Sequence, residues 1–179
     1  MRLRPSTLLL SAALSLSGLS ATPALAKSAA EWLALTGAVQ IGLSQAVEKA
    51  QAVAPGKAID VELEEGKKGA APYYSVTLIS PVNEEIKLRV NASTGDAAVE
   101  ENKGRAEGKH AKRLADARIT LVQAVDAAVA ALPGKPLEAQ LDSDWGKTSY
   151  KVKMLRADQT VMKLRLDPAT GAVTRQEKD

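Results

Sequence analysis

The sequence predicts an α+β protein made of two repeated units, each a helix packed on a small three- to four-stranded antiparallel sheet. Three observations support this fold class. Segments of the first unit return about 78 residues later, each expected helix is followed by three alternating apolar and polar segments, and Gly, Pro and Asx–Thr–Gly signals fall at equivalent places. A repeat of this length is a folding unit rather than a short solenoid step.

The repeat can be read directly from the sequence. The run IGLSQAV that begins at Ile41 returns as ITLVQAV at Ile119, and the Pro–Gly–Lys of 55–57 returns at 133–135. The run VNASTG, which begins at residue 90, returns as LDPATG after 76 rather than 78 residues. A two-residue slip indicates one shortened loop. The matched positions are apolar residues, Gly, Pro and Thr, which build a fold rather than a reaction centre.

The first 26 residues have the pattern of a signal peptide. Arg2 and Arg4 supply the positive start, an apolar stretch covers 8–19, and the sequence ALA provides a cleavage site between Ala26 and Lys27. The apolar stretch is shorter than the roughly 20 residues that a membrane-spanning helix needs. We therefore expect a periplasmic or secreted protein with no transmembrane segment after cleavage.

Each unit is expected to begin with an amphipathic helix. In the second unit Thr120 is the expected N-cap and Gln123 completes a capping box, while Gly42 takes the cap position in the first unit. The Pro–Gly pairs that contain Gly56 and Gly134 end the two helices. Apolar residues recur at helical spacing at Leu43, Ala46, Val47, Ala50 and Val53, and at Leu121, Ala124, Val125 and Ala128.

Three strands should follow each helix, with one buried and one solvated face. Their expected core residues are Ile59, Val61, Leu63, Tyr74, Val76, Leu78, Ile86, Leu88 and Val90, and then Leu137, Ala139, Leu141, Tyr150, Val152, Met154, Met162, Leu164 and Leu166. Each third strand ends in a turn that an Asx side chain opens and a Gly at positive φ closes. The turn residues are Asn91, Thr94 and Gly95, and Asp167, Thr170 and Gly171.

The expected domain boundaries follow from the repeat. They are a lead-in at 27–38, a first unit at 39–99, a charged linker at 100–116, a second unit at 117–175 and a tail at 176–179. The linker has almost no apolar residue before Leu114, which indicates a solvated connection. Because about 60 residues are marginal for independent stability, we expect the two units to dock, or the linker and second helix to stiffen the pair.

Composition excludes several classes of function. The chain has no Cys, which excludes disulfides, thiol catalysis and Cys-based metal sites. Its one His, His110, lies in the charged linker and cannot by itself form a catalytic triad or a multi-His metal site. Loss of Arg2 and Arg4 leaves 22 of the 24 basic residues against 21 acidic ones. The mature chain therefore lacks the excess of positive charge that would indicate nucleic-acid binding. We expect no enzyme, no catalytic residue, no cofactor and no metal.

The acidic residues of the first strand are candidates for a calcium site. Asp60, Glu62 and Glu64 face outward by parity, and Glu65 follows them. The ligand spacing of an EF-hand loop is absent, however. Contact with basic residues of the second unit, within or between molecules, is the alternative.

Basic residues are concentrated on two strands of the second unit. Lys151 and Lys153 alternate with core residues on its second strand, as Lys163 and Arg165 do on its third. Adjacent antiparallel strands would place all four on one face, where their mutual repulsion must be compensated. The face is either a docking site for an acidic partner or an anionic surface, or a solvated sheet face with splayed or covered charges.

Two aromatic residues are candidates for partner contacts. Trp145 lies in an expected tight turn, where it either folds back onto the sheet, the commoner fate, or is offered to a partner as a hot spot. Tyr73 faces away from the core by parity. With the four basic residues, these two complete the candidate partner-binding set.

The order of helix, Pro–Gly break, three alternating strands and V-[DN]-x-x-T-G turn resembles the PepSY domain, in both units. The resemblance implies a bacterial secreted or periplasmic protein. Such domains occur in propeptides of thermolysin-type peptidases, in spore-germination proteins and in small exported proteins, and the family is thought to bind and restrain peptidases. The sequence contains no His-Glu-x-x-His, so inhibition would act in trans.

The expected function is therefore that of a non-enzymatic exported protein-binding module, which restrains an extracytoplasmic peptidase. The partner would be that peptidase or another envelope protein. The alternative is an envelope structural or sensory protein that binds an anionic surface or a signalling partner through the basic sheet face of the second unit.

Overall fold

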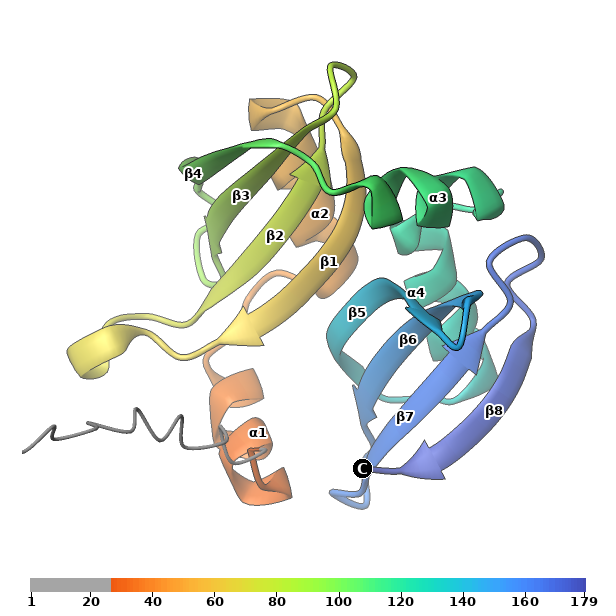
Figure 1. The fold of residues 1–179 in the computed structure, drawn as a ribbon. Helices are drawn as coiled ribbons and strands as arrows, with labels where there is room; N and C mark the ends of the chain where they lie inside the picture. The colour runs from red at the N-terminus through yellow and green to blue at the C-terminus, as the bar shows by residue number, and fades with distance from the viewer. Residues whose placement is uncertain (1–26) are drawn as a thin grey trace, which may run out of the picture.

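Residues 27–179, described by a computed structural model, form one eight-stranded antiparallel sheet with helices packed on it (Figure 1). The expected signal peptide lies outside the described residues. The strands are β1 Lys57–Glu64, β2 Tyr73–Ile79, β3 Glu84–Asn91, β4 Ala97–Arg105, β5 Lys135–Asp144, β6 Lys147–Leu155, β7 Val161–Leu166 and β8 Val173–Lys178. The helices are α1 Ala29–Gly37, α2 Leu43–Val53, α3 Gly108–Asp116 and α4 Leu121–Ala131, with a 3-10 turn at Lys67–Gly69.

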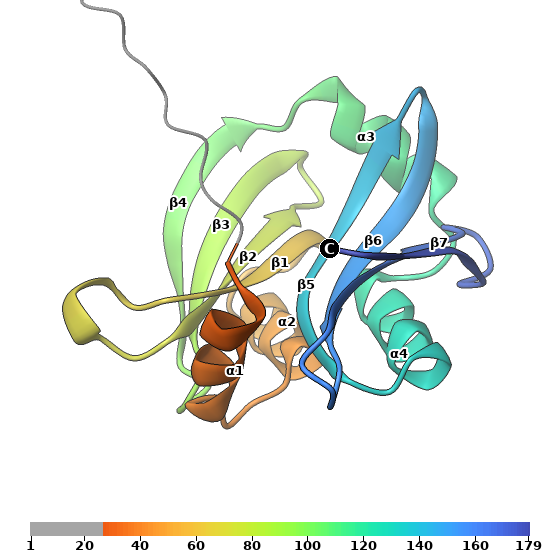
Figure 2. The ribbon, with the colours of Figure 1, turned by 90° about the horizontal axis from the view of Figure 1, so that it is seen from below.

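The strand order β4-β3-β2-β1-β5-β6-β7-β8 joins two four-stranded halves through the first strand of each. The helices α2 and α4 lie side by side on one face of this sheet (Figure 2). Their buried residues are the expected apolar stripes, except that Val53 is exposed. One hydrophobic core runs under both helices and across both units. The expected α+β class, with a helix and a small antiparallel sheet in each unit, is confirmed. No helix within 27–179 combines the length and apolar character needed to cross a membrane.

A β-bulge changes one expected core position. The register of β1 shifts between Ala58 and Asp60, so Ala58 joins the main core. Ile59 instead belongs to a second small cluster with Ile79 and Ala106. The expectation that Ile59 lies in the main core was therefore wrong, because strict alternation cannot anticipate an inserted residue.

Equivalent hydrogen bonds hold each helix to its own unit. The Tyr150 hydroxyl donates to the carbonyl of Ile119 at 2.6 Å, and the Tyr74 hydroxyl donates to that of Ile41 at 2.9 Å. The N–H of Ile119 donates to the carbonyl of Pro168, in the turn after β7. Both tyrosines are buried, so these bonds satisfy hydroxyl groups that burial would otherwise leave unpaired.

The expected caps are present. The N–H of Gln123 donates to the Thr120 hydroxyl at 3.2 Å, and the N–H of Thr120 donates to the Gln123 side chain at 2.8 Å, which completes the capping box. In the first unit the N–H of Gly42 donates to the side chain of Gln45 at 2.9 Å. Gly42 has no side chain, so only half of the box forms there.

The two Asx turns also form as expected. Asn91 Oδ1 accepts from two following N–H groups at 2.8 and 3.0 Å, and Asp167 Oδ1 accepts from the two equivalent groups, both at 2.9 Å. The Thr170 hydroxyl adds a third bond to Asp167 at 3.0 Å. The closing glycines have positive φ, 79° at Gly95 and 76° at Gly171. These turns are therefore specified locally by residue type.

The two units are related by a pseudo-twofold axis through the β1–β5 pair. Val61 pairs with Ala139, which is its own counterpart 78 residues later. Asp60 pairs with Gln140 on one side of this centre, and Glu62 pairs with Glu138 on the other. An antiparallel pairing centred on equivalent residues is the arrangement of an isologous dimer interface, here within one chain. The two units dock, as expected, by sharing a sheet.

The segments expected as a lead-in and a linker are equivalent helices. His110 lies 78 residues after Trp32, the offset that separates the starts of α2 and α4, and these two residues lie in α3 and α1. The two helices lie at opposite ends of the junction between the halves (Figures 1 and 2). The repeat therefore extends further toward the N-terminus than the apolar pattern indicated.

The solvated linker that the sequence indicated is instead strand and helix, since β4 continues to Arg105 and α3 follows. Arg113 pairs with Asp142 at 2.6 Å, and the Thr148 hydroxyl donates to Asp116 at 2.6 Å. Leu114 packs on both hydrophobic clusters. Arg113 and Asp116 thus contact the sheet, a pairing that composition alone could not show, while other charged residues of the segment, such as Lys109 and Lys112, are exposed.

His110 is also less solvated than expected. Its Nε2 lies 3.5 Å from Glu85 Oε2, and only 12% of its side chain is exposed. Its buried Nδ1 has no hydrogen-bond partner within the described part of the chain. Burial lowers the pKa of His110, although Glu85 acts against that shift.

Gly56 and Gly134 do more than end the helices. A Cβ on Gly134 would lie 2.7 Å from the carbonyl oxygen of Leu155, and a Cβ on Gly56 would lie 2.8 Å from that of Ile79. Both contacts are with backbone, which cannot move aside as a flexible side chain does. The repeated glycine therefore permits the close approach of the first strand to the second.

We predict that Gly134→Ala destabilises the protein by about 1–3 kcal/mol, because the added methyl group forces the backbones of β5 and β6 apart. Urea unfolding followed by circular dichroism measures the effect. Gly108→Ala is the matched control: its Cβ meets nothing within 4 Å, and alanine favours the helix. Equal unfolding midpoints for Gly134→Ala and the wild type would contradict this role.

Candidate functional site

The face of the second unit opposite α4 brings the four predicted basic residues together, and Trp32 of α1 lies beside Lys153 at its edge. Lys151 lies directly opposite Arg165 across the β6–β7 pair, and Lys153 lies opposite Lys163. The alternation of these side chains with buried residues places all four on the side of the sheet that α4 does not cover. The predicted cluster therefore exists. Its partner-binding role stays a prediction.

Carboxylates of the same unit compensate the first pair. Lys151 Nζ lies 2.7 Å from Asp142 and 3.0 Å from Asp144, and Arg165 also pairs with Asp144. Hydrogen bonds from Lys151 and Arg165 lower the pKa of Asp144. Burial alone would raise the pKa of Asp142, but its bonds from Lys151 and the nearby Arg113 lower it overall. This half of the face is close to neutral.

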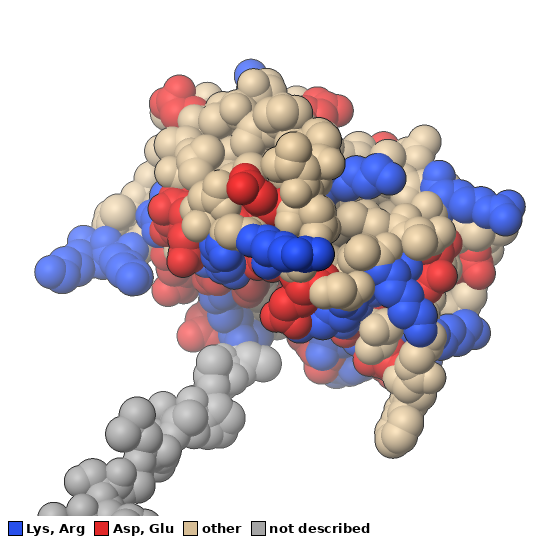
Figure 3. Space-filling model, turned by 45° about the horizontal axis from the view of Figure 1, so that its top comes forward, with Lys and Arg blue, Asp and Glu red and all other residues tan. Residues whose placement is uncertain are grey.

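The second pair is compensated by β5 and by the C-terminal residue. Lys153 Nζ lies 2.8 Å from Glu138 and 3.4 Å from Asp179, and Lys163 also pairs with Asp179. Burial alone would lower the pKa of Lys153, yet the hydrogen bond and charge of Glu138 raise it overall. The face shown in Figure 3 has Lys and Arg interspersed with Asp and Glu. The charges are thus neither splayed apart nor covered by the acidic strand of the first unit.

Trp145 stands fully exposed at the tip of the β5–β6 hairpin, with a relative accessibility of 105%. Positive φ at Trp145 (52°) and at Gly146 (78°) gives a two-residue turn of the type that matches strand twist. The strands close directly below it, where Asp144 pairs with Lys147. The expectation that this side chain packs back onto the sheet was wrong, because a turn this tight points the indole away from it.

Tyr73 is not a free aromatic surface. The guanidinium group of Arg89 lies over its ring, 3.5 Å from the ring centre, and Arg89 also pairs with Glu100 at 3.3 Å. Tyr73 pairs with Glu64, at the end of β1 remote from the β5–β6 hairpin. The structure therefore does not bring Tyr73 and Trp145 together.

Sequence reasoning missed an acidic cluster at the junction of the units. Glu62 lies directly opposite Glu138, and Asp60 lies two residues before Glu62 on the same face of β1. Burial, with the charges of Glu62 and Glu138, raises the pKa of Asp60 from 3.8 to about 7. Lys27 offsets part of this charge, 3.6 Å from Glu62 and 3.3 Å from Glu64. The 78-residue offset between Asp60 and Glu138 was the available signal, but only the symmetric strand pairing makes them neighbours.

No group of three or more His, Asp or Glu side chains within 27–179 is arranged to hold a metal ion. This includes the acidic residues of β1 that the sequence analysis weighed as a calcium site. Glu62 and Glu64 form ion pairs with Lys27, and Asp60 and Glu62 lie opposite residues of β5. The effect of this cluster is therefore electrostatic: its carboxylates repel one another and raise the pKa of Asp60.

We predict that Asp60→Asn stabilises the protein above about pH 7 and has little effect near pH 4. Because the folded state raises the pKa of Asp60 from 3.8 to about 7, charging this carboxylate opposes folding, and stability falls as pH rises through that window. The expected gain at about pH 8 is on the order of 2 kcal/mol. Urea unfolding at both pH values measures it, with the exposed Glu65→Gln as control. A gain that does not change with pH would contradict the assignment.

Comparisons with known proteins place the repeat in a family. The family model of the PepSY domain, described as "Peptidase propeptide and YPEB domain", matches twice, over residues 40–97 and 118–177. A crystal structure described as that of a "putative lipoprotein" from Clostridium difficile 630 shares 26% identity, over 69% of this chain and 83% of that chain, with a TM-score of 0.41. The comparison with curated proteins gives no match. The family matches cover more than half of the chain and coincide with its two structural units, and the chain belongs to the PepSY domain family.

Proposed function

We propose that this protein is a non-enzymatic, exported protein-binding module that restrains an extracytoplasmic peptidase in trans. Membership of a family named for peptidase propeptides supports the peptidase as partner. The signal-peptide pattern of residues 1–26 supports export. The observation that carries the proposal is the exposed Trp145 on its tight hairpin, because a large aromatic side chain fully in water is a candidate binding anchor.

The hairpin fixes the backbone of Trp145 before any partner arrives. Two positive-φ residues set the turn, and Asp144 at its base is tied to both Lys151 and Arg165. A rigid support reduces the conformational entropy lost on binding. The indole would then enter an apolar recess on the partner, with the polar strands beside it forming the rim of the contact.

The two copies differ at this hairpin. The equivalent loop of the first unit is longer and contains the 3-10 turn Lys67–Gly69, with Lys67 and Lys68 exposed and no aromatic residue. Binding through Trp145 would therefore use the second unit alone. This agrees with a duplication in which the surfaces diverged while the internal hydrogen bonds were kept.

A protein partner is favoured over an anionic surface by the ion pairs on the basic face. All four of its basic residues have carboxylate partners within the chain, so the face offers little uncompensated positive charge. Binding to an anionic polymer or lipid surface depends on such charge and weakens with salt. The four residues are better placed to shape the surface beside Trp145.

We predict that mature protein inhibits a thermolysin-type metallopeptidase or a serine peptidase at micromolar concentration, and that Trp145→Ala weakens the inhibition at least about tenfold, as loss of a hot spot does. Val82→Ala removes another exposed apolar side chain, on the first unit, and is the matched control. Inhibition constants from peptide hydrolysis measure both. Absence of inhibition in both peptidase classes would refute restraint in trans, and equal inhibition by Trp145→Ala would refute the anchor.

Intrinsic tryptophan fluorescence is a second measurement of whether Trp145 becomes buried when a partner binds. The sequence has two Trp residues, and Trp32 is already buried at 2% exposure. A blue shift of emission when a partner binds would therefore report on Trp145. A partner that binds without any shift would contradict burial of the indole.

A further inference from the structure

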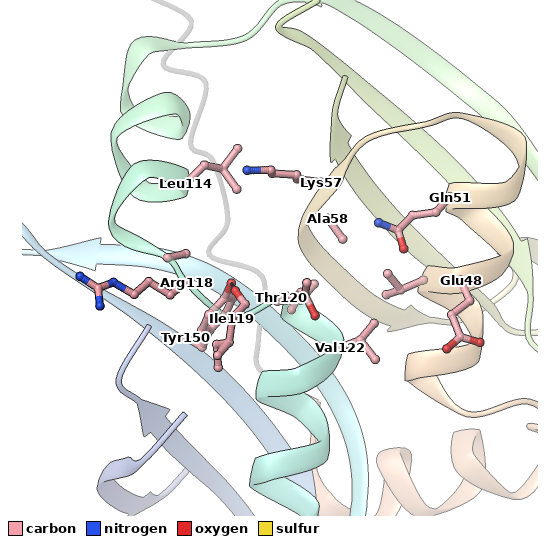
Figure 4. A pocket seen from close by; sticks show the side chains of 13 residues that line it. Glu48, Gln51, Lys57, Ala58, Leu114, Arg118, Ile119, Thr120, Val122 and Tyr150 are labelled. Carbon is pink, nitrogen blue, oxygen red and sulfur yellow. Dashed lines mark hydrogen bonds between the residues drawn. The ribbon is translucent and has the colours of Figure 1, made fainter. Parts of the chain in front are cut away.

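A pocket of about 300 Å³ lies where the two units meet (Figure 4). Helix α2 contributes Val47, the α3 helix contributes Leu114, and α4 contributes Val122, so its walls are largely apolar. Two basic residues, Lys57 at the start of β1 and Arg118 before α4, also line it. We refer to it as the junction pocket. Its size falls at the lower end of the range of about 300–1,000 Å³ for small-molecule sites.

The pseudo-twofold axis gives this pocket a counterpart. A second pocket of about 220 Å³ lies at the equivalent place, lined by residues of α1, of the segment before α2 and of β5. The differences that matter here are Leu114, Arg118 and Ala58 in the junction pocket, where the second pocket has Thr36, Gln40 and Pro136. Both pockets have a lysine at the start of the first strand of a unit, Lys57 in one and Lys135 in the other.

These differences make the junction pocket larger and more basic. Ala58 leaves space that Pro136 fills in the counterpart, and Leu114 supplies an apolar wall where Thr36 stands. Arg118 adds a charge that Gln40 lacks. The second pocket therefore serves as an internal reference, in which a similar backbone encloses less volume and carries one basic residue fewer.

The two basic residues of the junction pocket are electrostatically available. Within the described part of the chain, neither Lys57 nor Arg118 has a carboxylate at ion-pair distance. Lys135, the counterpart of Lys57, donates instead to the carbonyl of Thr36 at 3.5 Å. Figure 4 shows Lys57 beside Leu114, with Glu48 and Gln51 on the opposite wall. The guanidinium group of Arg118 points away from the other lining side chains, so Lys57 is the cation nearest the cavity.

We infer that the junction pocket binds a small aliphatic monocarboxylate. The tail would be buried against Val47, Leu114 and Val122, because removing apolar surface from water is the main gain available there. The carboxylate would lie beside Lys57, away from Glu48 on the other wall, and Arg118 at the rim would add a more distant positive charge. This site uses neither Trp145 nor the basic face of β6 and β7, so it is independent of the proposed peptidase contact.

Such a ligand would also bridge the two units. The pocket walls come from α2 and β1 of the first unit and from α3 and α4 of the second part of the chain. A molecule that binds only when these segments are docked stabilises the docked state by mass action. Binding should therefore raise the unfolding temperature of the whole protein.

Titration calorimetry and thermal unfolding of the mature chain with octanoate, octanol and octylammonium test the inference. Octanoate is expected to bind and to raise the unfolding temperature, octanol to bind at least about tenfold more weakly, and octylammonium not to bind. The double variant Lys57→Gln/Arg118→Gln should lose about tenfold in octanoate affinity. Both residues are exposed, so this variant is expected to fold as the wild type does.

The counterpart pocket supplies the control. Lys135→Gln removes the equivalent lysine and should leave octanoate affinity unchanged. Glu48→Gln, which removes the opposing carboxylate, should tighten it. The inference is overturned if octanoate does not bind, if octanol or octylammonium binds as tightly, if the double variant keeps wild-type affinity, or if Lys135→Gln loses as much as the double variant.

Discussion

The antiparallel pairing of β1 with β5 is the interaction on which the rest of the structure depends. Val61 and Ala139 meet at its centre with no exposed surface, and the hydrogen bonds around them merge two four-stranded sheets into one. Without this pair, each unit would present a long sheet edge and a core of marginal size. On the helix side, the Ser44 hydroxyl donates to Asp126 at 3.2 Å, so the same axis also brings α2 and α4 together.

The same pairing concentrates negative charge. Glu62 and Glu138 are cross-strand neighbours, and the half-buried Asp60 lies next to them, which is why its pKa rises. Lys27 approaches this cluster from the first unit, and Lys153 from the second. The junction is therefore held by backbone bonds and apolar burial against an electrostatic cost, and the compensating lysines decide how large that cost is.

The two copies share their internal hydrogen bonds but differ in the residues at several other equivalent positions. Tyr74 and Tyr150 make the same bond to the start of a helix, but the helices that flank the junction carry Trp32 in one copy and His110 in the other. Trp145 has no counterpart in the first unit, and the two junction-side pockets differ in size and charge. Both proposed binding sites lie where the copies differ. The shared fold therefore positions the sites, and the residues that differ between the copies would contact the ligands.

The sequence by itself determined the features that depend on residues close together in the chain. The capping box at Thr120, the turn at Asp167 and the apolar stripes follow from local hydrogen bonds and periodicity, which residue types specify directly. Only the tertiary structure decided which strands join the units, which carboxylates neutralise the basic face, that Ile59 leaves the main core and that Trp145 points into solvent. These depend on contacts between distant segments and on one bulge, and alternation along a strand contains no information about either.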